Sequence, residues 1–252
     1  MRSPQLLVKS ITVPWFCDRL RRLLARKPFK RARMRALVQK LSPVQEAILI
    51  TTIFAGWFIF SAVLIMLAGF PTVEGGSFDD AAALSLVVFE CIAFVIGAVV
   101  LRWRGWTLSN FAFRITGRHV LAGLVLLGLA TAANWLVWLL AGTSLDSGSM
   151  IREIFERTPV SLGVAVLVSV VNGTFEEFFL CRYLIERFQA SGATFAVTLS
   201  AGIRMLYHVY QGPFGTLSIL AFGLIIGTYY WRTRALGAVV VTHIVADLIA
   251  LA

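Results

Sequence analysis

Two adjacent carboxylates within an apolar stretch are the residues most able to do chemistry in this chain. Glu176 and Glu177 occur in VSVVNGTFEEFFLCRYLIERF, where most neighbouring side chains are hydrophobic. A charged side chain at the centre of a bilayer costs at least about 2.5–3.5 kcal/mol on insertion scales. Two of them side by side therefore indicate a functional site within a membrane.

Two later apolar segments carry further ionisable residues. His208 lies in LYHVY, and His243 lies in THIVAD, which also supplies Asp247. His243 and Asp247 are four residues apart, so they share one face of a helix. Counting 1.5 Å per residue from the predicted inner ends of the helices places these groups and Glu176 at overlapping depths, roughly 12–22 Å. We therefore expect one intramembrane site built from three helices.

The composition indicates the fold class. Of 252 residues, 58% are hydrophobic and 14% are charged, whereas soluble domains carry roughly 25% charged residues. Several runs reach the 18 or more apolar residues that cross a bilayer as a helix, and lipid requires every backbone polar group to be paired internally. The sequence predicts an all-α polytopic membrane protein of about seven transmembrane helices, with a four-helix catalytic core in its C-terminal part.

Breaks in the apolar runs predict the boundaries. Residues 1–44 form a basic segment, 45–158 hold three transmembrane helices with their loops, and 159–252 form the four-helix core. The predicted spans are 46–67, 81–101, 120–141, 159–189, 194–210, 214–231 and 235–252.

The positive charge is uneven. Twelve of the 23 Lys and Arg precede residue 41, and beside this much apolar sequence they indicate a surface that faces anionic lipids and not nucleic acid. The segment is either an interfacial amphipathic helix interrupted at Pro28 or a disordered basic tail. The alternation of basic loops predicts a cytoplasmic N-terminus and an external C-terminus. No signal-peptide pattern precedes the first span, so we expect the N-terminus to be retained.

The remaining motifs limit the chemistry. Cys17, Cys91 and Cys181 are widely separated and predict neither a disulfide framework nor a cysteine zinc site. The chain has no HExxH and no GxSxG motif. A buried carboxylate that holds a water, with imidazoles nearby, suits amide hydrolysis. Alternatively, Glu176, His208 and His243 match the three protein ligands of a catalytic zinc ion, so one zinc is a candidate cofactor.

The order of these motifs resembles a known family. Two glutamates, a histidine at the end of a following span and His-x-x-x-Asp in the last span resemble the CAAX-protease and bacteriocin-processing (Abi, CPBP) family of intramembrane metalloproteases. The resemblance covers residues 159–252 and includes YHVYQGPFGTLSILAFGLIIGTYYWRT. It implies an intramembrane endopeptidase that acts on a peptide or membrane-anchored protein among membrane lipids. Prenylated CAAX proteins and bacteriocin-type peptides are both implied substrates, and a bacterial plasma membrane is the expected location.

The resemblance also implies roles for the residues. Glu176 would activate the water and Glu177 would assist it. His208 would share in binding the water or a metal. His243 and Asp247 would bind the water, a metal or the oxyanion.

Three positions depart from the family pattern. EExxxR usually places an arginine at the position of Cys181, whereas here the arginine is Arg182. FxxxH usually has phenylalanine at the position of Arg204, and many members have asparagine at that of Asp247. We hypothesise that Arg204, one turn before His208, replaces the displaced arginine as the partner of the glutamates.

The sequence leaves other charged residues and other functions to consider. Glu186 and Arg187 are expected to be solvated near the interface, and Glu90 in the second span to pair with another helix. The alternative function is a catalytically inactive relative that acts as a membrane immunity or assembly factor by binding. A proton-coupled carrier and a bis-histidine haem protein, using His208 and His243, are weaker alternatives.

Overall fold

The structure is a computed structural model, and it describes residues 27–68, 78–141 and 160–251. The chain divides into two units, Met1–Leu41 and Ser42–Ala252. The loops predicted around residues 69–77 and 142–159, and most of the basic N-terminal segment, lie outside the described residues.

The first unit contains one described helix, α2 (Lys27–Gln39). The residues before Lys27, over which a helix interrupted at Pro28 was expected, lie outside the described residues, and Pro28 itself belongs to α2. Over residues 27–39 the basic segment is therefore helical.

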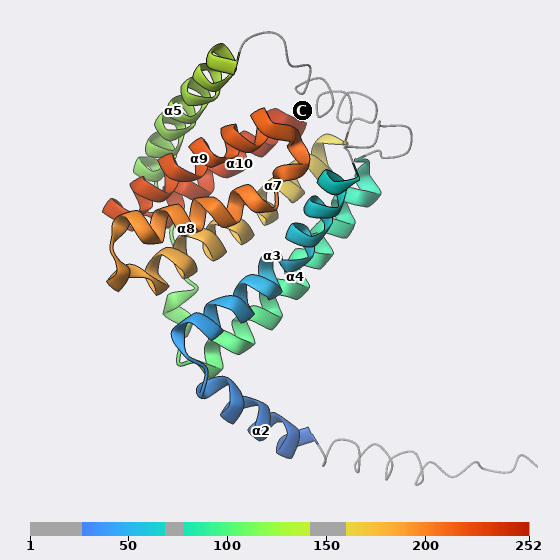
Figure 1. Ribbon diagram of the computed structural model, residues 1–252, viewed down its shortest axis with the longest axis vertical. Coiled ribbons are helices and arrows are strands. Elements are labelled where there is room, and N and C mark those ends of the chain that lie inside the picture. Colours follow the sequence, from blue (N-terminus) through green and yellow to red (C-terminus); the bar gives the residue numbers. More distant parts are fainter. Residues whose placement is uncertain (1–26, 69–77, 142–159, 252) are drawn as a thin grey trace, which may run out of the picture. The chain divides into compact units, whose positions relative to one another are not determined.

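The second unit is built from apolar helices, and no strand occurs in the described ranges (Figure 1). These helices follow the predicted spans closely, apart from the fifth. Their bounds are α3 (Pro43–Leu67), α4 (Asp80–Trp103), α5 (Gly117–Ala141), α7 (Leu162–Glu177), α8 (Ala193–Leu206), α9 (Gly212–Thr233) and α10 (Leu236–Leu251).

Capping residues in the sequence begin two of these helices. Ser42 accepts a hydrogen bond from the Gln45 backbone N–H, and the Gln45 side chain accepts one from the Ser42 N–H, which is a capping box. Asp79 caps α4 by accepting from the backbone of Ala82. Each cap satisfies backbone donors that the helix itself leaves unpaired.

Within the described residues, five helices are long and apolar enough to cross a membrane: Pro43–Leu67, Asp80–Trp103, Gly117–Leu140, Leu162–Ile185 and Val209–Thr233. The helices α8 and α10 are apolar but shorter. The predicted fold class, an all-α polytopic membrane protein, is confirmed. The fifth predicted span extended to residue 210, whereas α8 ends at Leu206 and is only about 21 Å long. His208 consequently lies in the turn after α8.

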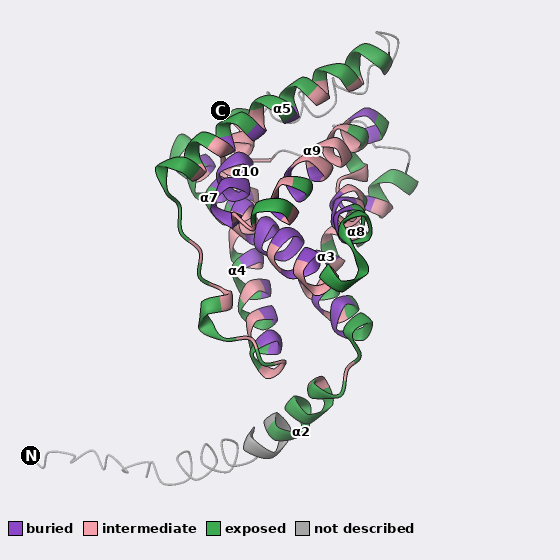
Figure 2. Cartoon of the chain, turned by 90° about the vertical axis from the view of Figure 1, so that its left-hand side faces the viewer, coloured by how far each residue is buried: buried purple, intermediate pink, exposed green. Residues whose placement is uncertain are grey.

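Small residues let the helices of the C-terminal core approach one another closely. A Cβ atom on Gly173 of α7 would lie 3.1 Å from the backbone nitrogen of Ile244 in α10, and one on Gly223 of α9 would lie 3.2 Å from the Cα of Ala201 in α8. Figure 2 shows the buried residues concentrated in α7 and α10, while the outward face of α5 is exposed. The sequence therefore places carboxylate-bearing α7 directly against histidine-bearing α10.

A buried ionic cluster joins the start of α3 to the ends of α4 and of the helix that follows α7. Glu46 is 3% exposed and accepts hydrogen bonds from Arg104, Arg187 and Tyr183. These three segments, which are far apart in the sequence, meet at Glu46 in the structure. The cluster connects the N-terminal helices of this unit to the C-terminal core.

Glu46→Gln is expected to lower the free energy of unfolding by about 2 kcal/mol, because two partly buried arginines lose their anion. Denaturant titration of the purified protein in mixed micelles measures this change. Glu186→Gln is the matched control: its ion pair with Arg182 is more exposed, so a loss of no more than about 1 kcal/mol is expected. Equal losses in the two variants would contradict a special role for Glu46.

Candidate active site

The helix that carries the two glutamates changes its winding directly after them. Residues Leu162–Glu177 are α-helical, and Phe178–Ile185 form a π-helix, η2. Such i→i+5 segments are rare and occur frequently at functional sites. The widened turn is supported from α8, where the buried Ser200 hydroxyl donates to the Leu180 carbonyl at 2.8 Å. A regular helix was predicted over this stretch, so the π-helix was missed.

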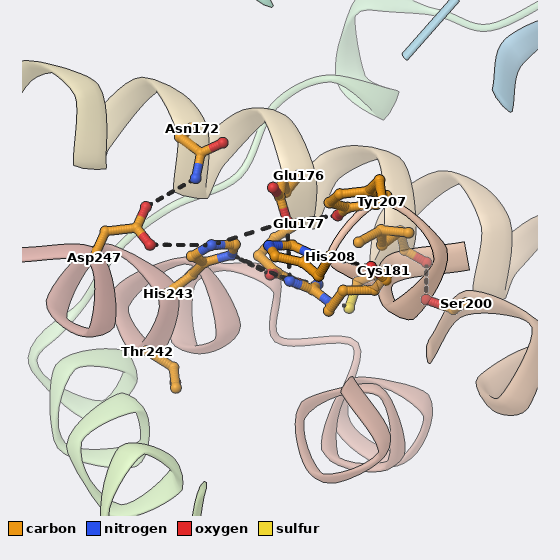
Figure 3. Close-up of polar contacts among 12 residues, drawn as sticks. Asn172, Glu176, Glu177, Cys181, Ser200, Tyr207, His208, Thr242, His243 and Asp247 are labelled. Atoms are coloured by element: carbon orange, nitrogen blue, oxygen red, sulfur yellow. Dashed lines mark hydrogen bonds and ion pairs between the residues drawn. The ribbon is translucent and has the colours of Figure 1, made fainter. Parts of the chain in front are cut away.

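Arg204 of α8 forms ion pairs with both glutamates, which Figure 3 labels. Its guanidinium is 3.1 Å from Glu176 Oε2 through one terminal nitrogen and 2.6 Å from Glu177 Oε1 through the other. The Arg204 side chain is 2% exposed, so this interaction is almost free of solvent screening. The pairing is the one hypothesised from the sequence. The single positive charge of Arg204 offsets one of the two negative charges that make the paired carboxylates costly in lipid.

The two glutamates differ in how completely they are hydrogen-bonded. Glu177 is fully buried: its Oε1 pairs with Arg204 and His243, and its Oε2 accepts from the Cys181 thiol at 3.2 Å. Glu176 retains 11% side-chain exposure and uses only Oε2, which pairs with Arg204 and with the Tyr207 hydroxyl at 2.6 Å. Its Oε1 accepts no hydrogen bond from the described residues. Glu176 is thus the carboxylate with an oxygen free for a substrate or a water.

His243 of α10 lies between carboxylates. Its Nδ1 is 2.6 Å from Glu177 Oε1, and its Nε2 is 3.5 Å from Asp247 Oδ1 and 3.9 Å from Glu176 Oε2. Only the doubly protonated imidazolium can donate to acceptors at both ring nitrogens. The site therefore brings together Glu176, Glu177, His243 and Asp247 as the sequence predicts, with Arg204 among them.

His208 is placed differently from the other predicted residues. Its Nδ1 lies 2.9 Å from the Arg204 carbonyl, and its ring packs against that of Tyr207 with centroids 4.6 Å apart. A carbonyl can only accept, so we assign the proton to Nδ1, which leaves the Nε2 lone pair available. In the described part of the chain, the His208 side chain makes no hydrogen bond to either glutamate.

Two residues of the site were missed by sequence reasoning. Asn172 donates to Asp247 at 2.9 Å, and Tyr207 donates to Glu176. Asn172 could have been found, because an amide one turn before Glu176 in an apolar helix is itself unusual. Tyr207 offered no such signal among the aromatic residues around it.

Arg182 does not contact the glutamate pair. It bonds instead to Glu186 at 3.1 Å and to the backbone carbonyl of Asn110, and Glu186 also accepts from Tyr230. Arg187 pairs with Glu46. Glu186 and Arg187, which were expected to be solvated, keep 27% and 26% of their side-chain surface exposed, and helix packing also brings a charged partner to each of them.

The donor set does not fit a zinc ion in this arrangement. Among residues 27–68, 78–141 and 160–251, no group of three His, Cys, Asp or Glu side chains is arranged to hold a metal. The Arg204 guanidinium lies 3.1 Å from Glu176 Oε2 and 3.4 Å from His243 Nδ1, so a dication there would meet a fixed positive charge. His208 faces a backbone carbonyl. The zinc ion remains a prediction, and no step of the proposed reaction depends on it.

Glu90 of α4 is a further buried carboxylate near this site. It is 1% exposed, and its Oε2 has no hydrogen-bond partner in the described parts of the chain. The helix that carries it, α4, packs against α7, which carries the two glutamates. The expected pairing of Glu90 with a group on another helix is thus not seen at this oxygen.

Glu90→Gln is expected to leave the free energy of unfolding unchanged or to raise it by about 1–3 kcal/mol, because it removes an unpaired buried acid without changing side-chain shape. The same micelle titration measures it, with Glu46→Gln as the comparison that should destabilise. A loss above about 1 kcal/mol would mean that the Glu90 carboxyl group has a stabilising partner.

The fold and the site together define a class of protein: a helical integral membrane protein with a buried glutamate–arginine–histidine cluster inside its C-terminal helices. Residues 158–249 match the family model described as type II CAAX prenyl endopeptidase Rce1-like. The match confirms the resemblance to the CAAX-protease family over these residues, which make up less than half of the chain. Comparisons with curated proteins and with solved structures gave no match.

Proposed function

We propose that this protein is an intramembrane endopeptidase that hydrolyses a peptide bond with a water activated by Glu176. The observation that carries the proposal is the asymmetry of the glutamate pair. Glu177 is saturated with partners and fully buried, whereas Glu176 keeps a free Oε1 and partial exposure beside the same arginine. A general base needs such an accessible oxygen. The neighbouring Glu177 holds Arg204 in place beside it.

The proposed reaction assigns each proton. Glu176 Oε1 takes a proton from the water as the water oxygen attacks the peptide carbonyl carbon, and His208 Nε2 is available to accept a hydrogen bond from the remaining O–H, whose hydrogen stays on that oxygen. The Arg204 guanidinium and the His243 imidazolium supply the positive charge that stabilises the oxyanion. Glu176 then returns its proton to the amide nitrogen as the C–N bond breaks, which releases an amine and a carboxylic acid.

The substrate class is proposed from the family match. A peptide ending in a Cys-aliphatic-aliphatic-X sequence, with a farnesyl group on the cysteine, is the probe that the CAAX description suggests. The same peptide without the lipid represents the unprenylated alternative. The predicted cytoplasmic N-terminus and bacterial plasma membrane belong to this proposal as well.

Comparing peptides from membrane fractions of wild-type and Glu176→Gln cells tests the function even while the natural substrate is unidentified. New peptide ends present only in wild-type membranes are expected, and the purified protein should cleave one of the two probe peptides. Identical peptide ends in the two strains at equal expression, with neither probe cleaved, would favour a non-catalytic membrane-binding factor.

A further inference from the structure

Asn172 lies at the edge of the site, where it connects two helices. It is four residues before Glu176 on α7, so the two side chains share one helix face. Its amide nitrogen donates to Asp247 Oδ2 of α10 at 2.9 Å (Figure 3). This neutral side chain therefore links the glutamate-bearing helix to the histidine-bearing helix.

Asp247 depends on Asn172 for its position. Its side chain is 23% exposed, and its two partners among the described residues are His243, at 3.5 Å, and Asn172. Glu177, on the other side of the histidine ring, is held by Arg204 and Cys181 besides His243. Glu177 and Asp247 both hold the His243 ring. Of these two carboxylates, Asp247 is thus the one that would be freed by the loss of a single contact, the hydrogen bond from Asn172.

The nature of the two groups also matters. A carboxylate beside His243 favours the imidazolium, whereas a carboxylate at the position of Asn172 would lie one turn from Glu176 and repel it. A negatively charged Asp247 would also repel an oxyanion. The neutral amide of Asn172 therefore lies on α7, where it does not repel Glu176. The carboxylate of Asp247 lies on α10, where it favours the charged form of His243.

We propose that Asn172 is a positioning residue that holds the Asp247 carboxylate against His243 Nε2, so that the ring keeps its orientation toward the two glutamates. This inference rests on the proposed function, because the histidine matters only if the site is catalytic. Asp247 then acts on His243 and not directly on the oxyanion.

The first test exchanges the two groups. Asn172→Asp, Asp247→Asn and the double exchange are compared with wild type in cleavage of the probe peptide. Asn172→Asp should lower kcat about 100-fold, with KM within about twofold. The substitution replaces the hydrogen bond from Asn172 to Asp247 with two carboxylates that repel each other. The double exchange restores one donor and one acceptor, so its kcat should exceed that of Asn172→Asp about tenfold. If the reduction of kcat in the double exchange equals the product of the reductions in the two single variants, the proposal is overturned.

The second test needs no activity. The chain has three histidines, so ¹⁵N-histidine labelling resolves the ring signals of His243 in the purified protein. Asn172→Ala, or Asn172→Ser if the first variant does not fold, should move the His243 Nε2–H proton signal upfield or broaden it, because the Asp247 acceptor is released. Ser169→Ala is the matched control: this buried hydroxyl lies three residues earlier on α7 and bonds only to its own helix backbone.

The two tests separate the inference from the proposed function. If wild type cleaves neither probe peptide and its membranes show no peptide ends that Glu176→Gln membranes lack, the proposed function fails, while the His243 signal still reports whether Asn172 positions Asp247. An unchanged His243 signal in the Asn172 variants overturns the positioning role, whatever the cleavage assay gives.

Discussion

Arg204→Met is expected to lower the free energy of unfolding by about 3–5 kcal/mol, the largest stability effect in the molecule. The variant leaves the carboxylates of Glu176 and Glu177 without the cation that lies 3.1 and 2.6 Å from them. Glu177 is fully buried, so water cannot replace the lost partner. Methionine occupies a similar volume, and the loss is therefore attributed to charge and not to a cavity.

Two further variants make this prediction specific. Arg204→Lys keeps the charge but cannot present two parallel donors to two carboxylates, so an intermediate loss is expected. Arg182→Met removes the arginine that the family pattern would place at the glutamates, yet its contacts are with Glu186 and Asn110, and it should cost no more than about 1 kcal/mol. Titration in mixed micelles would contradict the prediction if Arg182→Met proved more damaging than Arg204→Met.

Glu176→Gln is expected to reduce kcat for peptide cleavage by at least about 10³-fold, because an amide cannot accept the proton of the attacking water. Stability should change little by comparison, since Arg204 keeps Glu177 as a partner and the Tyr207 hydroxyl can donate to the amide oxygen. Steady-state rates on the probe peptide, measured beside micelle titrations, distinguish a lost base from a lost fold.

Glu186→Gln is the control for this variant. Glu186 is an acid on the same continuous helical run, bonded to Tyr230 and Arg182 away from the cluster, and its replacement should leave kcat within about twofold. Retention of more than a tenth of the wild-type rate by folded Glu176→Gln would remove Glu176 from the role of base.

Much of the helical pattern could be predicted, because a long apolar run in lipid must pair its own backbone polar groups, and a helix does so within the segment. The bounds of α3, α4, α5, α9 and α10 lie within a few residues of the predicted spans. The exception is α8. Its apolar character continues beyond Leu206, so hydropathy could not reveal that the backbone turns there and leaves His208 outside the helix.

For the site, the sequence alone predicted one group of ionisable side chains, because such groups are too costly in lipid to stand alone. The predicted members were Glu176, Glu177, His208, His243 and Asp247. Arg204 was the hypothesised partner of the glutamates because it lies one turn before His208. What only the tertiary structure decided is which atoms meet. The close approach at Gly173, the π-helix after Glu177 and the turn at His208 set distances that no linear spacing contains.

The two adjacent glutamates show the difference most clearly. They are adjacent in sequence, and both were expected to contribute to one site, with Glu176 activating the water and Glu177 assisting it. Packing makes Glu177 the buried anchor for Arg204, His243 and Cys181, and it leaves Glu176 with one free oxygen. Neighbouring residues on a helix point about 100° apart, so their surroundings come from different helices, and those surroundings exist only once the chain has folded.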